Sequence, residues 1–355
     1  MPNTEETLGY HAPIIPGMDQ EGEKLASELV HDDTILRATE EHHQGSNPNN
    51  VQKTLDASRA ERMTSYKVED FSPLTGREED WRFTPLKRLG GLHTDSLEHS
   101  APALKITAPS AVAVEEVQRE DERIGMAGVP EDRVAANAWS HFKTATVVTI
   151  PAEAELNEQV EIAIVGTHRD PAAQHLVVEA KPFSKSVVVI RHTGSATLAQ
   201  NIEFLVGDSA QLSVICVQQW DDDAVNASAQ YVKLGRESRF KHVCISLRGD
   251  LVRVTPSTKF TQPGAETEMY GLYFVDAGQH IESRLFVDHS VPNCKSRVTY
   301  KGALQGKGAH SVWVGDVLIG KDAEGTDTYE LNRNLLLEVG PRADSVPNLE
   351  IETGR

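Results

Sequence analysis

The sequence has little cysteine, no dense basic stretch and no long hydrophobic run. Its 355 residues include three cysteines, Cys216, Cys244 and Cys294, with no Cys-x-x-Cys pair. This excludes a disulfide framework and a zinc ribbon. No apolar run approaches the roughly 20 residues that a membrane span requires. Acidic residues (53) outnumber basic ones (35), giving a net charge of −18, so general binding to nucleic acid or anionic lipid is disfavoured.

Common enzyme motifs are also absent from the sequence. It contains no Gly-x4-Gly-Lys-Ser/Thr, Gly-x-Gly-x-x-Gly, Gly-x-Ser-x-Gly or His-Glu-x-x-His segment. Chemistry that needs a phosphate loop, a dinucleotide cradle, a nucleophile elbow or a zinc helix is therefore not indicated. Residues 1–17 hold no cationic segment followed by an apolar stretch, so we expect no secretory signal. Together with the few cysteines, this predicts a protein of the cytoplasm.

The first hundred residues differ in character from the rest. We predict that residues 1–50 form an acidic, partly disordered tail with one helix. Residues 51–104 are expected to be a helical N-terminal region, because the apolar spacing over 51–68 suits an amphipathic helix. Trp81 and Phe83 follow in a segment rich in aromatic and charged residues. Large aromatic side chains of this kind usually fix one structural unit onto another.

Beyond Lys105, short β-branched runs are separated by Gly, Pro, Asp and Asn. Each run has the length of a strand and is too short for an ordinary helix. Helical patterns do not alternate with them, which disfavours a doubly wound α/β sheet. The clearest runs are residues 145–150, 160–165, 176–179, 187–190 and 212–217.

Glycines recur in this region with a regular spacing. Gly207, Gly235 and Gly264 are 28 and 29 residues apart, and each is followed three residues later by a small residue. Gly306 and Gly340 continue the series at intervals of 42 and 34 residues, which we interpret as insertions. A glycine turn, a small residue and a strand at this period indicate stacked coils. Chance is the alternative, since the chain has 25 glycines.

The repeat places two cysteines at equivalent positions. Cys216 and Cys244 are 28 residues apart, so in stacked coils their backbones lie on adjacent strands, about 4.8 Å apart. One interpretation is a soft-metal or persulfide site. We favour a column of small buried side chains, because free cysteine is often buried.

The richest polar stretch, residues 283–304, contains Asp288, His289 and Cys294. These side chains offer oxygen, nitrogen and sulfur donors, and a thiolate–imidazole pair could bind iron. Neighbouring residues of a strand alternate between faces, however, so Asp288 and His289 are expected to point apart. A polar turn explains the composition without any ligand. His289, Cys294 and His310 therefore stay weak candidates for metal ligands.

Four ordered segments resemble the SufB/SufD family of iron–sulfur cluster assembly proteins. The segment Trp81-Arg82-Phe83-Thr84-Pro85 has the form found in SufD. Where SufB carries a Thr-Gln-Cys-Asp-Ser segment, this chain reads Thr328-Tyr329-Glu330-Leu331-Asn332, without sulfur. The resemblance is thus closest to SufD and spans roughly residues 51–351. The segments that carry it are residues 79–86, 288–302, 326–337 and 343–351.

This resemblance implies both a fold and a role. The fold is mainly β, with a helical N-terminal region, a right-handed parallel β-helix core over 105–355 and a helical C-terminal domain. The role is that of a subunit that pairs with a SufB-like scaffold and a SufC-like ATPase to build or deliver clusters and acquire iron. No cofactor would be bound stably, and a cluster would sit only at an interface with a partner. The sequence ends at Arg355, so the C-terminal domain and the family's histidine before it have no matching residue here.

Strand addition at the edge of the last coil would supply the contact with the partner. We place this interface at Asn332, Asn334, Leu335 and Leu337, and a second copy of the chain could use the same edge. Two alternatives stay open at this point. One is a β-helix carbohydrate-active enzyme with acidic loops, and the other is a truncated chain that assembles nothing. The favoured hypothesis is an assembly subunit that is not an enzyme.

Overall fold

The computed structural model describes residues 62–94 and 96–353. The predicted tail (1–50) and most of the predicted helix over 51–68 lie outside this part of the chain. The described residues of the 51–104 region contain turns and two short 3-10 helices, η1 (Val68–Asp70) and η2 (Leu86–Arg88), instead of α-helices. Prolines and glycines interrupt this region, and proline cannot continue a helix.

An α-helix, α4 (Arg133–His141), occurs instead within the range that was predicted to be β-helix. Its N-cap is Asp132, whose side chain accepts a hydrogen bond of 2.8 Å from the amide of Ala135. This bond satisfies one of the amides that a helix leaves free at its start. None of the helices in the described residues has the length and apolar character of a membrane span.

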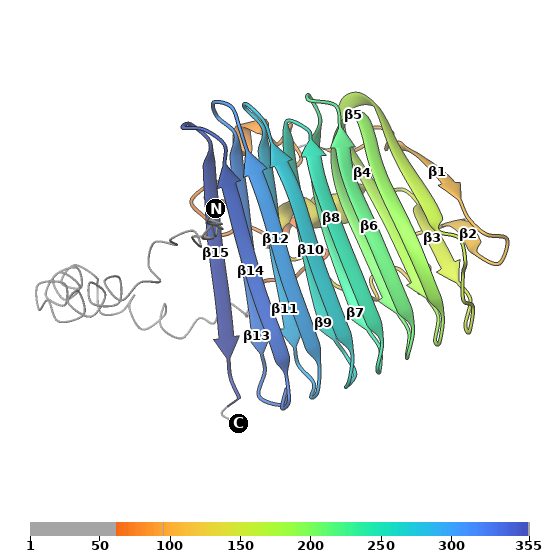
Figure 1. Ribbon diagram of the computed structural model, residues 1–355. Coiled ribbons are helices and arrows are strands. Elements are labelled where there is room, and N and C mark those ends of the chain that lie inside the picture. The colour runs from red at the N-terminus through yellow and green to blue at the C-terminus, as the bar shows by residue number, and fades with distance from the viewer. Residues whose placement is uncertain (1–61, 95, 354–355) are drawn as a thin grey trace, which may run out of the picture. The chain divides into compact units, whose positions relative to one another are not determined.

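The remainder of the chain winds into a parallel β-helix with two sheets, as the sequence predicts (Figure 1). Two long strands bend in the middle and contribute one half to each sheet: β4 (Val160–Ala180) and β5 (Lys185–Val206). The first sheet continues through β6 (Gln211–Trp220), β8 (Arg239–Arg248), β10 (Glu266–Val275), β12 (Lys295–Leu304) and β14 (Asp327–Leu336). The second sheet contains β3 (Ala145–Ile150), β7 (Val225–Leu234), β9 (Leu251–Phe260), β11 (His280–His289), β13 (His310–Ile319) and β15 (Arg342–Ile351). Two antiparallel strands, β1 (Ala103–Thr107) and β2 (Ala113–Val117), flank the first coil.

The glycines of the repeat lie at the corners between the two sheets. Gly207, Gly235 and Gly264 precede β6, β8 and β10, so they occupy the same corner in successive coils. Gly306 lies at the opposite corner, before β13, where a Cβ would approach Ala277 to 2.6 Å. The interval of 42 residues is therefore one and a half coils, and not an insertion. Gly340 follows one coil later, and its longer interval comes from the loop between β13 and β14.

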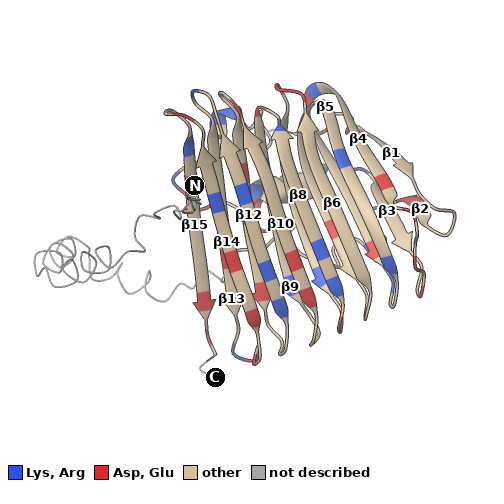
Figure 2. Ribbon diagram, viewed as in Figure 1, with Lys and Arg blue, Asp and Glu red and all other residues tan. Residues whose placement is uncertain are grey.

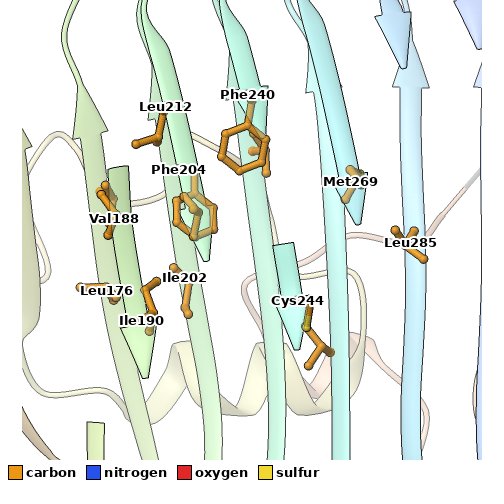
Figure 3. Packing of buried hydrophobic residues seen from close by; sticks show 14 of the residues in the cluster. Leu176, Val188, Ile190, Ile202, Phe204, Leu212, Phe240, Cys244, Met269 and Leu285 are labelled. Atoms are coloured by element: carbon orange, nitrogen blue, oxygen red, sulfur yellow. The ribbon is translucent and has the colours of Figure 1, made fainter. Parts of the chain in front are cut away.

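Apolar side chains that point inward fill the space between the sheets. Alternate residues of each strand face this core, as the twofold periodicity of a strand requires. Phe204 and Phe240, from opposite sheets, have ring centroids 5.5 Å apart. Figure 3 shows these rings among aliphatic side chains of both sheets. Fully burying one large apolar side chain stabilises the fold by about 1.5–3 kcal/mol, so the core holds the coils together.

The outer faces of the two sheets differ. On the first sheet, acidic and basic side chains of neighbouring strands pair, as Lys241 and Glu268 do at 2.8 Å (Figure 2). The second sheet is covered by α4 and by the loops that precede it. Trp81 is buried there, with the Arg253 guanidinium 3.9 Å from its ring centroid, whereas Phe83 is only half-buried. The covering side chains include Trp81, Leu89, Leu92, Val134 and Ala138.

Candidate functional site

The last coil, formed by β14 and β15, has an open edge. Each of these strands pairs with one neighbour, β12 or β13, and has no strand on its other side within the described residues. Its outward backbone groups are therefore available for hydrogen bonds. An unpaired edge of this kind is a template for pairing with another chain.

The apolar core is also open at this coil. Ile319 and Ile351 are register partners on successive strands, yet Ile319 is 8% exposed and Ile351 is 57% exposed. Leu336 and Leu349 are about half exposed in the same way. These side chains continue core columns that have no further coil above them in the described part of the chain. The end of the β-helix thus presents core-type surface together with a free strand edge.

The residues predicted for the interface divide into two kinds. Leu335 and Leu337 are exposed, at 61% and 51%, and are accessible to a partner. Asn332 and Asn334 instead point toward the lumen, where Asn332 donates a hydrogen bond of 2.9 Å to the hydroxyl of Tyr273. Asn334 donates to the side-chain oxygen of Asn332 at 2.7 Å. The asparagines therefore order the strand from inside.

Sequence reasoning missed Leu349 and Ile351 as members of this surface. Their signal was the alternation of residues 345, 347, 349 and 351 in the last strand, which puts every second side chain on the core face. Glu330 was missed as well. One of its carboxylate oxygens is buried without a hydrogen-bond partner among the described residues. Burial, and secondarily the charge of Asp316, raises the pKa of Glu330 to about 7.

Cys216 and Cys244 are register partners on β6 and β8, which confirms that they lie on adjacent coils. Both thiols are buried, and the side chain of Gln218 lies 3.5 Å from the sulfur of Cys216. The hydrogen bond from Cys244, followed by the neighbouring His192 and His242, lowers the pKa of the Cys216 thiol. The same pairing raises the pKa of Cys244, since a second negative charge there would be repelled. The pair can share one proton at low dielectric.

His289 and Cys294 occupy separate environments. His289 points into the core, stacks on Phe260 with ring centroids 4.5 Å apart, and bonds Ser296 at 2.9 Å. Its burial lowers its pKa to about 4. Asp288 lies on the other face of the strand, as predicted. The Cys294 thiol donates to the carbonyl of Gln262 at 3.7 Å.

His310 lies beside a second histidine that sequence reasoning missed. Its Nδ1 is 3.2 Å from the Nδ1 of His280, and its Nε2 is 2.6 Å from a carboxylate oxygen of Asp344. Burial lowers the pKa of His310, an effect that Asp344 partly offsets. The available signal was the spacing of 30 residues, which is close to one coil. In the described part of the chain, no group of three or more His, Cys, Asp and Glu side chains is placed to hold a metal ion.

The fold defines this chain as a parallel β-helix protein whose last coil is open. Residues 163–355 match the family described as SUF system FeS cluster assembly, SufBD core domain. The chain is 48% identical to an iron–sulfur cluster assembly SufBD family protein of Mycobacterium leprae, over 82% of this chain and 76% of the relative. A relative from Mycobacterium tuberculosis is 47% identical over 84% of this chain and 77% of its own length. One from Synechocystis is 22% identical over 58% and 48%.

The chain therefore belongs to the SufBD family of iron–sulfur cluster assembly proteins. This confirms the family that the four sequence segments indicate. Closeness to SufD within the family stays a prediction.

Proposed function

We propose that this protein is a SufD-like, non-catalytic subunit of an iron–sulfur cluster assembly complex. It pairs with a SufB-like scaffold through its last coil, and a SufC-like ATPase joins the complex. The cluster is the cargo of this assembly and is held only where the chain meets a partner. Family membership supports the assembly role and disfavours a carbohydrate-active enzyme.

The open last coil is the observation that carries the proposal. A partner strand placed beside β14 or β15 would satisfy the free backbone groups of that edge. It would also cover Leu336, Leu349 and Ile351, which are about half exposed. Completing the burial of each would contribute roughly 1 kcal/mol by its apolar area. Hydrogen bonds of the edge would give orientation, and the apolar columns would give affinity.

Co-purification tests this interface. The full chain would be co-expressed with SufB-like and SufC-like proteins and isolated through a tag on the SufB-like partner. The double variant Leu335→Asp/Leu337→Asp should lose most of the complex, because it places two charges in the contact. The matched control is Leu272→Asp, which alters a comparably exposed leucine on β10, away from the last coil.

Retention of the complex by the double variant, at the level of the control, would refute the interface. Sedimentation of the chain without partners gives a second measurement. A dimer that dissociates on the same double substitution would show that a second copy, and not a SufB-like chain, occupies this edge.

A further inference from the structure

Two histidines begin adjacent strands of the second sheet and face each other. His280 and His310 are register partners on β11 and β13. Their Nδ1 atoms lie 3.2 Å apart, and their ring centroids are 4.9 Å apart with an angle of 70° between the ring planes. His280 is buried, while the side chain of His310 is 20% exposed. The pair therefore lies just beneath the surface, within reach of solvent.

The other nitrogen of each ring has a carboxylate partner. Nε2 of His280 is 3.2 Å from Glu282, and Nε2 of His310 is 2.6 Å from Asp344. An ionised carboxylate only accepts hydrogen bonds, so each Nε2 must carry a proton and donate it. A neutral imidazole with its proton on Nε2 has a lone pair on Nδ1. The two Nδ1 lone pairs consequently face one another, an arrangement that repels unless a cation lies between them.

The carboxylates are themselves held in place. Glu282 accepts a hydrogen bond of 2.7 Å from the hydroxyl of Thr84 and lies 3.4 Å from Arg253. Asp344 pairs with Arg342 at 2.8 Å. These contacts fix the acceptors and therefore the orientation of both rings. A histidine that donates its second ring nitrogen to a fixed carboxylate is the usual form of a metal ligand in proteins.

The two measured distances also locate the point on which the rings converge. For rings placed symmetrically, they put the crossing of the two centroid-to-Nδ1 directions about 2.2 Å from each nitrogen, close to the Zn–N distance of about 2.0–2.1 Å. Imidazole nitrogen suits Zn²⁺, Co²⁺ and other borderline divalent ions.

We propose that His280 and His310 form a binding site for one borderline divalent cation, held through their two Nδ1 atoms. Water fills the remaining coordination positions, entering from the side where His310 and Asp344 are partly exposed. This site lies on the outer face of the second sheet, apart from the buried cysteine pair.

Titration of the reduced, chelator-treated full chain tests the site. Zn²⁺ is followed by calorimetry and Co²⁺ by its visible absorption, and each should bind at one ion per chain. His310→Gln should abolish this binding, and Asp344→Asn should weaken it about 10- to 100-fold by freeing the ring. His141→Gln is the matched control, since that histidine bonds a backbone carbonyl on α4 and should leave binding unchanged.

A variant with all three cysteines replaced by serine separates this site from thiolate binding. It should retain the ion, and X-ray absorption at the zinc edge should show nitrogen and oxygen ligands without sulfur. This spectrum needs no histidine variant and so does not depend on how those variants fold. The proposal is overturned if the wild-type chain binds neither ion, which would leave a shared proton between the rings. It is equally overturned if sulfur appears in the spectrum.

Discussion

Gly271 and Tyr300 are register partners on β10 and β12, and the tyrosine ring occupies the space above the glycine. A Cβ at residue 271 would lie 1.9 Å from a ring carbon of Tyr300. The relation is reversed at the next inward position, where a Cβ on Gly302 would lie 1.9 Å from the ring of Tyr273. Each coil therefore supplies a glycine where its neighbour supplies a tyrosine, and the rings fit within the lumen.

Gly271→Ala should destabilise the protein by about 3 kcal/mol, because the ring of Tyr300 is fully buried and overpacking forces strain. The midpoint of urea unfolding measures this loss. Gly278→Ala is the control: a Cβ there meets nothing within 4 Å, although φ is +75°. It should cost only about 1–2 kcal/mol, from backbone conformation alone. An unchanged midpoint for Gly271→Ala would contradict the packing described for the lumen.

Trp81→Ala should cost about 3–5 kcal/mol, the range for removing a large buried aromatic side chain. The change leaves a cavity over the second sheet and takes away the ring above Arg253. Phe83→Ala, two residues away, removes a half-buried ring and should cost roughly 1 kcal/mol. Urea unfolding compares the two. Equal losses would mean that Trp81 does not fasten the N-terminal segment to the sheet.

Glu330 should make stability depend on pH. Its pKa in the folded protein is about 7, above the ordinary value near 4.3, so the folded state holds the proton more tightly than the unfolded state. The associated stability is complete below the ordinary pKa and is lost as pH rises through 7. The loss amounts to roughly 3 kcal/mol.

Glu330→Gln removes the titrating group with little change of shape. Its urea midpoint should exceed that of the wild type at pH 8, and the advantage should vanish near pH 5. Parallel pH profiles for the two proteins would show that Glu330 ionises normally in the fold.

Local patterns in the sequence predicted much of the fold. The run at residues 145–150 coincides with β3, and the other β-branched runs fall within longer strands, because alternation and branching act within a single strand. Helix α4 was missed because its alanines do not stand out in a search for strands, although Asp132 supplied an N-cap. Gly306 was placed in the wrong corner because both corners of a coil require the same turn chemistry.

The candidate sites were harder to predict, since they depend on which residues become neighbours between coils. Residues on different coils meet only through the register of parallel strands, as His280 and His310 do. Register follows from loop lengths, and these vary from coil to coil. The spacing of Cys216 and Cys244 was readable because no length change separates them. The exposure of Ile351 is a property of position in the stack, which no local pattern records.

Hydrogen–deuterium exchange of the chain, alone and with a SufB-like partner, tests the central claim most directly. Amides of β14 and β15 should exchange at least about tenfold more slowly in the complex, because strand pairing protects backbone amides from solvent. Amides in the middle of the β-helix, such as those of β7 and β9, should show no change. Binding of the partner with unaltered exchange in β14 and β15 would contradict assembly through the last coil.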